Sequence, residues 1–185
     1  MYWGNIMKID FYKQLNDLKE IPGYKSFNLD RTNCYGKIFE EGKKYHCDGE
    51  IKFGPRGNGF HYAERFEDTI RYSGNPSSGS VRDVAIAKVI GSGTIVSSFD
   101  DYNEYFDMYA CSDLYIDKFL TRDEIISLAL DLPELRMCRF LSLYKLTSDE
   151  IALFKNKNYI VERCLYYQYL CEENNGFRKE MKRNT

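Results

Sequence analysis

The chain contains two histidines, and the stretch around one of them is the first place to look for chemistry. His61 lies in NGFHYAERFEDTIRY, residues 58–72, where a glycine turn precedes an aromatic strand and a short helix. An imidazole at a strand end often hydrogen-bonds to the backbone, but imidazoles also contact ligands and transfer protons near neutral pH. Three roles therefore stay open for His61: a structural hydrogen bond, a ligand contact, and general acid–base catalysis.

Other stretches have residue types that bind metals or phosphate, but they lack the required spacing. His46 and Cys47 have no second pair at zinc-site spacing. The acidic stretch FDDYNEYFDMYACSD, residues 99–113, lacks the D-x-[DN]-x-[DN]-G pattern of a calcium loop. The glycine-rich GPRGNGF, residues 54–60, is interpreted as a hairpin loop, with a phosphate cradle as the alternative. We predict no metal site.

The composition is ordinary for a soluble globular protein, with 43% hydrophobic and 29% charged residues and a formal net charge of −2. This balance gives no reason to expect nucleic acid or membrane as a partner. No apolar run approaches the ~20 residues of a membrane helix, and the start has no signal-peptide pattern, so we expect a cytoplasmic protein. In that reducing compartment, the six cysteines are expected to be free and buried.

The first part of the chain consists mainly of short β-type segments. Apolar residues at helical intervals predict a helix at residues 8–21, which Pro22–Gly23 would stop. Residues 24–30 and the glycine-punctuated residues 34–63 are typical of strands joined in hairpins. Residues 73–80, SGNPSSGS, predict a loop.

The strongest strand is expected at residues 81–98. Both of its faces are apolar, which is typical of a central strand covered on both sides, and Gly91 and Gly93 are expected to bend or end it. One face would carry Val84, Ile86 and Ile90, and the other Ala85, Ala87 and Val89. Residues 99–113 predict a solvated surface segment packed by tyrosines, and residues 114–121 another strand.

From Thr121 onward the pattern becomes helical. LTRDEIISL and LTSDEIALF each begin with a capping box, in which Thr121 pairs with Glu124 and Thr147 with Glu150. A last helix is predicted in NYIVERCLYYQYLCEE, before a polar tail.

These elements predict an α+β fold. Residues 1–120 would form a mostly antiparallel, twisted sheet flanked by helices. Residues 121–185 would form a helical C-terminal subdomain packed on that sheet.

Four segments follow one another in a recognisable order: YKSF, FEEGKKYHCDGEI, NGFHYAERFEDTIRY and VAIAKVIGSG. Between Tyr24 and about Ile126, this order resembles a family of uncharacterised phage-encoded proteins with the pattern Y-K-G-F, G-x-x-Y, C/N-G-F-H, a short helix and a strand closing on glycine. A similar block resembles the N-terminal domain of giant-virus ankyrin-type proteins, although no ankyrin repeat follows Thr121. Ser26 stands where the phage pattern has glycine. The resemblance implies a viral or phage protein in the host-cell cytoplasm.

The stretch GFHYAERFEDTIRY is also similar to the G-x-Y-F-A…S-x-x-Y corner of ADP-ribosyltransferases. The likeness implies that His61 stands where those enzymes have a tyrosine that stacks on nicotinamide, and Tyr62 where they have the following phenylalanine. Tyr24 and Ser26 fall near the first-strand motif, H-G-S or Y-R-G, with Lys25 in place of its histidine or arginine. Any ligand is therefore expected near Tyr24, Ser26, His61 and Tyr62.

The glutamate that those enzymes need for catalysis has three candidates, none on a strand beside the other motif residues: Glu104, Glu124 and Glu150. Without a complete catalytic set, we expect an interaction module that acts on a protein partner, with no cofactor. The alternative is an NAD-binding ADP-ribosyltransferase-like protein, active or degenerate, with NAD as its cofactor. Nucleic-acid binding through scattered lysines is a third hypothesis, which the net charge of −2 disfavours.

Overall fold

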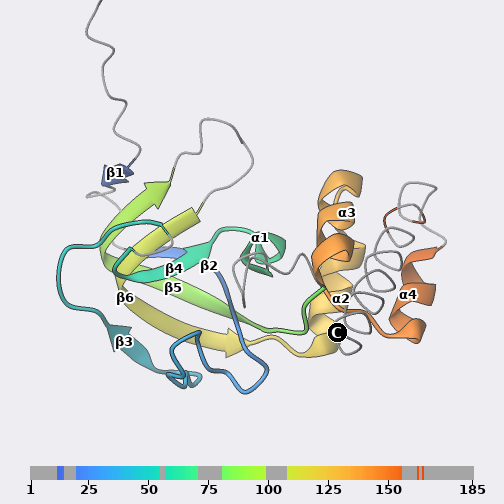
Figure 1. Ribbon diagram of the computed structural model, residues 1–185, viewed down its shortest axis with the longest axis horizontal. Coiled ribbons are helices and arrows are strands. Elements are labelled where there is room, and N and C mark those ends of the chain that lie inside the picture. Colours follow the sequence, from blue (N-terminus) through green and yellow to red (C-terminus); the bar gives the residue numbers. More distant parts are fainter. Residues whose placement is uncertain are drawn as a thin grey trace, which may run out of the picture.

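The computed structural model describes residues 12–14, 20–54, 57–70, 81–98 and 108–155, with residues 162 and 164. The strands in these ranges are β1 (Tyr12–Gln14), β2 (Glu20–Phe27), β3 (Lys44–His46), β4 (Phe60–Ala63), β5 (Ala85–Ser98) and β6 (Met108–Phe119). The helices are α1 (Phe66–Ile70), α2 (Arg122–Leu130), α3 (Glu134–Leu143) and α4 (Ser148–Lys155). The predicted α+β class is confirmed. The strands gather at one end, α2, α3 and α4 at the other, and α1 lies between them (Figure 1).

All strand pairings are antiparallel, in the order β1-β5-β2-β4-β6-β3. A further pairing joins β5 to β6, so that β5, β2, β4 and β6 form a closed ring. The long strand β5 makes closure possible, because one of its edges pairs with β2 and the other with β6. The ring closes at a single residue pair between β2 and β4, Tyr24 with Ala63. Closure pairs both edges of β5 and of β6, whereas the second edge of β2 pairs with β4 at Tyr24 alone.

The prediction that β5 is a central strand is confirmed. Its two faces line two different cores: Val84 and Ile86 contact the helices, and Ala85, Ala87 and Val89 lie in the ring core. The strand continues past Gly91 and Gly93 to Ser98. A register shift between Ser92 and Ile95, with φ of +74° at Gly93, marks a bulge there. The glycines therefore interrupt the register without ending the strand.

The two cores have different compositions. The ring core is rich in aromatic residues: Phe27, Phe39, Tyr62 and Phe119 join Ile21, Ala87, Val89, Ile95, Cys111, Leu114 and Ile116. The helical core joins α1 and the start of β5 to α2, α3 and α4, through Phe66, Ile70, Val84, Ile86, Leu120, Ile125, Ile126, Ala129, Met137, Phe140, Leu141, Tyr144 and Phe154. The helices therefore share one apolar core with the sheet.

The N-terminal predictions are wrong where the structure describes them. Tyr12–Gln14 is a strand paired with the end of β5 rather than part of a helix; the other residues predicted for that helix, apart from Glu20 and Ile21 in β2, lie outside the described residues. Pro22 and Gly23 lie inside β2 and do not stop an element. Proline is tolerated there because β2 pairs at Pro22 with β5 alone.

Strand β6 begins earlier than predicted. Met108–Asp113, predicted as the end of a surface segment, is paired with β4 and β5, and residues 99–107 lie outside the described residues. Both faces of this part of β6 are covered, since Cys111 belongs to the ring core and Ala110 to a small cluster with Ile51 and Val96. A strand buried on both faces has no alternation of polar and apolar residues.

Both predicted capping boxes are present. Glu124 N–H donates to Thr121 Oγ1 at 3.2 Å, and Thr121 N–H donates to Glu124 Oε2 at 2.8 Å. The same two bonds join Thr147 and Glu150 at 3.3 and 2.7 Å. The predicted short helix after His61 is present as α1, and α3, which was not predicted, follows Pro133 and has Glu134 in its first turn.

The predicted loop at residues 73–80 and the polar tail lie outside the described residues, as does the last predicted helix apart from Glu162 and Cys164. The described cysteines are free, as predicted: Cys34, Cys47, Cys111, Cys138 and Cys164. Their predicted burial holds only for Cys111, since Cys34 is exposed and the others are partly buried.

Candidate binding site

Tyr24 and Ser26 lie on β2 and contact α1. The Tyr24 ring packs edge-on against Phe66, with centroids 6.0 Å apart. Ser26 Oγ donates a hydrogen bond to the carbonyl oxygen of Thr69 at 2.6 Å. Alternate residues of a strand point to the same face, so both side chains belong to the contact that holds α1 against the sheet.

The His61 imidazole is enclosed and neutral. Its Nε2 accepts a hydrogen bond from the Gly54 N–H at 3.2 Å, and its ring lies 5.1 Å from that of Phe53. Burial, and then the charge of Lys25, lower the pKa of His61 to about 4, although a hydrogen bond with the Gly59 backbone acts in the opposite direction. This geometry corresponds to the structural role among the three that the sequence leaves open.

Tyr62 crosses the interior of the ring. A Cβ on Gly91 would lie 2.2 Å from the Tyr62 hydroxyl, and one on Gly23 would lie 2.8 Å from the Tyr62 ring, so the two glycines make room for the side chain. The hydroxyl is buried and has no hydrogen-bond partner in the described structure. Burial, and then Cys111 and Tyr109, raise the pKa of Tyr62. The phenol is therefore a neutral filler of the ring core.

The four predicted ligand-binding residues do not converge. His61 and Tyr62 are neighbours in β4, and neighbouring strand residues point to opposite faces. Their contacts differ accordingly, since His61 meets Phe53 and Tyr62 lies in the ring core. Tyr24 and Ser26 face α1. That a ligand binds near all four residues stays a prediction.

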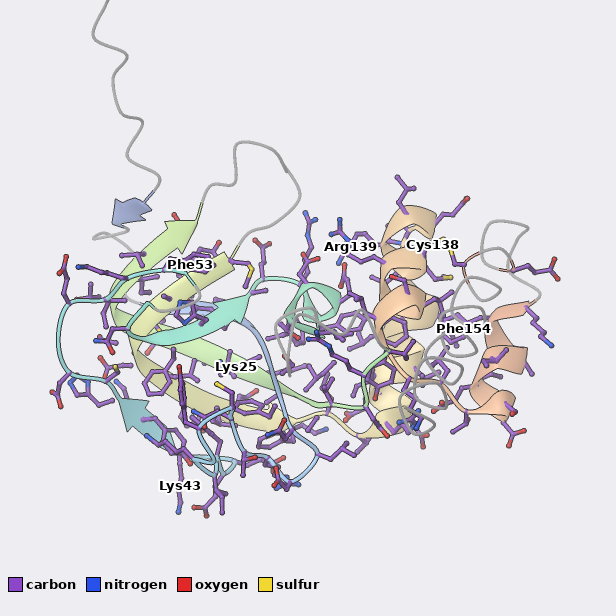
Figure 2. The ribbon with its side chains drawn as sticks, viewed as in Figure 1. Lys25, Lys43, Phe53, Cys138, Arg139 and Phe154 are labelled. Atoms are coloured by element: carbon purple, nitrogen blue, oxygen red, sulfur yellow. The ribbon has the colours of Figure 1, made fainter. Side chains whose placement is uncertain are left out.

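Lys25, which was not predicted as a site residue, is a polar residue of the ring interior. Its Nζ donates to the carbonyl oxygen of His61 at 2.6 Å, and Figure 2 shows it among the strands, away from α2–α4. Burial lowers the pKa of Lys25 to about 8, against the opposite influence of Cys111 and Cys34. The sequence does indicate this position, because Lys25 alternates with Ile21, Gly23 and Phe27 on the buried face of β2.

Residues 28–41, which we call the display loop, cross from β2 toward β3 with extensive internal hydrogen bonding. Asn28 N–H donates to the Thr32 carbonyl at 2.9 Å. The Asn33 side-chain oxygen accepts from the N–H groups of Tyr35 and Lys37, both at 3.0 Å. Thr32 and Ile38 form an antiparallel bridge. The loop is therefore a defined hairpin rather than an open connection.

The display loop has one buried anchor and three exposed apolar side chains. Phe39 is fully buried, with its ring 5.0 Å from Phe27. Leu29, Tyr35 and Ile38 of the same loop are 62%, 85% and 62% exposed. The anchor fixes the loop on the ring core, and the other three side chains face water.

A polar cluster at β3 has residue types found in hydrolases but in a different order. Asp113 lies between His46 Nδ1, at 3.1 Å, and Ser112 Oγ, at 2.9 Å. The hydrogen bond with Asp113 raises the pKa of His46. Because the carboxylate separates the hydroxyl from the imidazole, the histidine cannot activate the serine. Within the described part of the chain, no group of three or more His, Cys, Asp or Glu residues is placed to hold a metal ion.

Two buried carboxylates join α1 to α3. Arg136 Nε donates to Glu67 Oε1, and Arg139 Nη1 donates to Asp68 Oδ1 at 2.9 Å; Arg139 lies on α3 close to α1 (Figure 2). The remaining oxygens, Glu67 Oε2 and Asp68 Oδ2, are buried and have no hydrogen-bond partner among the described residues. Burial raises the pKa of Asp68, although Arg139 opposes this. The contact is a structural ion-pair interface.

Fold and surface define a small α+β domain built on a closed antiparallel ring, with an ordered loop that exposes apolar side chains. The chain belongs to the DUF7666 family, a domain of unknown function, whose profile matches residues 21–127. The matched segment contains the ring strands and the display loop. No curated protein and no solved structure matches the chain. Among the described helices, none is long and apolar enough to span a membrane.

Proposed function

We propose that this chain is an interaction module that binds a protein partner through the display loop. The observation that carries the proposal is the exposure of Leu29, Tyr35 and Ile38 on one short loop, at 62%, 85% and 62%. Large apolar side chains that are exposed together on a folded domain mark interaction sites. Burying such surface stabilises a complex by roughly 25 cal/mol for each Å² removed from water.

The internal order of the display loop supports the same function. Its hydrogen bonds from Asn28 and to Asn33, and the Phe39 anchor, fix the backbone before a partner arrives. A preorganised loop loses less conformational entropy on binding than a flexible one. Tyrosine is favoured in binding surfaces because it offers a large contact area with few rotatable bonds.

The NAD-binding alternative has no comparable support. His61, which the ADP-ribosyltransferase likeness places against nicotinamide, packs on Phe53 and accepts a bond from Gly54. Tyr62 fills the ring core. A titration calorimetry experiment with NAD⁺ at millimolar concentration tests this alternative directly, and we expect no heat of binding.

The test of the proposed function is a peptide-display library panned on the immobilised full chain. The variant Leu29→Ser/Tyr35→Ser/Ile38→Ser removes the exposed apolar side chains. A matched control, Leu135→Ser/Leu153→Ser, changes residues that are 81% and 56% exposed on α3 and α4.

We expect peptides enriched on the unchanged chain to bind the control equally and the loop variant at least tenfold more weakly. Circular dichroism melts establish that both variants fold. Equal binding of the enriched peptides to the folded loop variant would refute the proposal, and so would an absence of enrichment.

A further inference from the structure

We infer that the partner segment bound by the display loop is acidic, with carboxylates that pair with Arg31 and Lys37 while its apolar side chains cover Tyr35 and Ile38. This inference rests on the proposed function. It specifies the chemistry of the partner, which the exposed apolar residues alone leave open.

Two exposed cations of the display loop, Arg31 and Lys37, contact the faces of aromatic rings instead of forming ion pairs with carboxylates. The Arg31 guanidinium lies 4.6 Å from the centroid of the Phe119 ring. Lys37 Nζ lies 5.1 Å from the centroid of Tyr45 and 5.6 Å from that of Phe39. Neither cation has an ion pair with a described carboxylate. Ring faces orient the two cations without neutralising their charge.

The carboxylates of the same loop are occupied by other groups. Asp30 Oδ1 accepts from the Thr32 N–H at 3.0 Å and hydroxyl at 2.6 Å. Glu40 pairs with Lys43 at 2.6 Å. Glu41 Oε1 accepts from the backbone N–H of Phe119 at 2.7 Å. Asp30 and Glu41 keep their charge, and only Glu40 is paired with a cation, but none of the three acids forms an ion pair with Arg31 or Lys37.

Four other lysines of the surface do have carboxylate partners. Lys43, Lys44, Lys52 and Lys118 each have a carboxylate oxygen within 4 Å. Behind the loop, the amine of Lys25 adds a further positive charge, bonded only to the His61 carbonyl among the described groups. The display loop thus combines exposed apolar side chains with positive charge that no described acid pairs.

An acidic polypeptide fits this surface better than a nucleic acid. Of the three exposed apolar side chains only Tyr35 is aromatic; Leu29 and Ile38 are aliphatic and cannot stack on bases, and stacking supplies much of the affinity for single strands. Arg31 and Lys37 are only two cations, too few for the many phosphate contacts of a typical nucleic-acid site. Carboxylates beside an aromatic or aliphatic residue would meet both components of the loop.

The experiment uses the same panned library and reads the composition of the peptides whose binding requires the loop. We expect Asp and Glu to be at least twofold more frequent in them than in the input library. Their affinity should fall as sodium chloride rises from 50 to 500 mM, because exposed ion pairs are screened.

The variant Arg31→Glu/Lys37→Glu should weaken these peptides about tenfold. Lys88→Glu/Lys155→Glu, which makes the same charge change at exposed residues outside the loop, should leave the affinity within twofold.

The outcomes separate the two claims. If enriched peptides bind through Tyr35 and Ile38 but show no excess of Asp and Glu, the acidic partner is refuted and the proposed function stands. If no peptide depends on those side chains, the proposed function itself fails. If the oligonucleotide dT20 binds the loop at the same concentrations and loses affinity in Arg31→Glu/Lys37→Glu, the surface recognises nucleic acid and the inference is wrong.

Discussion

Folding should shift the pKa values of the two histidines in opposite directions. The chain is well suited to show this because it contains only two histidines. The folded structure lowers the pKa of His61 from 6.5 to about 4, mainly through burial. One pKa unit corresponds to about 1.4 kcal/mol. Placing a proton on His61 therefore costs about 3 kcal/mol more in the folded than in the unfolded chain.

The sign of the stability change follows from proton uptake. The unfolded chain binds the His61 proton as pH falls through 6.5, while the folded chain binds it only near 4. Between these values the unfolded state holds more protons, so the free energy of unfolding decreases as pH falls. At pH 4.5 the loss due to His61 amounts to about 2.5 kcal/mol relative to neutral pH.

Two measurements check this reasoning. In ¹H–¹³C NMR spectra, the His61 ring signal should stay at its neutral position down to about pH 5, and the His46 signal should titrate above 6.5, as the directions of their pKa shifts require. Urea denaturation should show that His61→Gln, which keeps an acceptor for the Gly54 N–H, loses about 2.5 kcal/mol less stability than the unchanged chain between neutral pH and pH 4.5.

Two further variants sharpen the comparison. Lys25→Met should raise the pKa of His61, but not fully to 6.5, because burial is the larger cause. His46→Gln should act in the opposite sense to His61→Gln. A raised folded-state pKa means that His46 stabilises the fold at acid pH and that this contribution is lost as pH rises. A His61 signal that titrates between pH 6 and 7 in the folded chain would refute the reasoning.

Three other predictions concern the packing of the fold, each measured by urea denaturation. Gly91→Ala should destabilise the chain by about 1–3 kcal/mol, because its Cβ would lie 2.2 Å from the Tyr62 hydroxyl. Tyr62→Phe, which removes that unpartnered hydroxyl, should be nearly neutral. A folded Gly91→Ala chain with unchanged stability would contradict the packing. Arg139→Met should cost about 3 kcal/mol, the low end for breaking a buried pair, because it removes the hydrogen-bonded cation of Asp68 while Arg65 and Arg136 still act on that carboxylate. Asp68→Asn added to Arg139→Met should restore part of that loss, whereas purely additive effects would count against the ion pair. Thr147→Ala should cost about 1 kcal/mol through loss of the α4 cap, and a loss below a few tenths would show that the capping box contributes little.

Local signals in the sequence were sufficient where the structure depends on local chemistry. The capping boxes at Thr121 and Thr147 need only a hydroxyl and a glutamate three residues later, and both are present. The apolar run of β5 was equally informative, because a strand covered on both faces must be apolar on both.

Predictions failed where pairing with distant strands decided the structure. Tyr12–Gln14 lies in a helix-like pattern but pairs with β5, so tertiary contact overrides local periodicity. Gly23 has the sequence features of a stop, but it lies within β2, where a Cβ would approach the Tyr62 ring. Nothing in the local sequence of β2 indicates that ring, because Tyr62 comes from β4.

The candidate surface was harder to predict than the fold. His61 was selected by its residue type, and the structure shows its imidazole accepting a hydrogen bond from the Gly54 N–H. Residue type does not distinguish the display loop, because leucine, tyrosine and isoleucine are equally common in protein cores. Only burial distinguishes Ile38, which is 62% exposed, from its neighbour Phe39, which is fully buried.

The Arg122 guanidinium connects the segment matched by the family profile to residues that follow it in the chain. It bonds Glu150 at 2.5 and 2.8 Å, Asp83 at 3.2 Å and the Lys145 carbonyl at 2.7 Å. The family profile ends at residue 127, inside α2. A chain that ended there would lack Glu150 and Lys145, two of the three residues that Arg122 bonds. The apolar side of α2 would then be exposed to water. A family member that ended at that point would need another segment or another molecule to cover the apolar core that α3 and α4 cover in this chain.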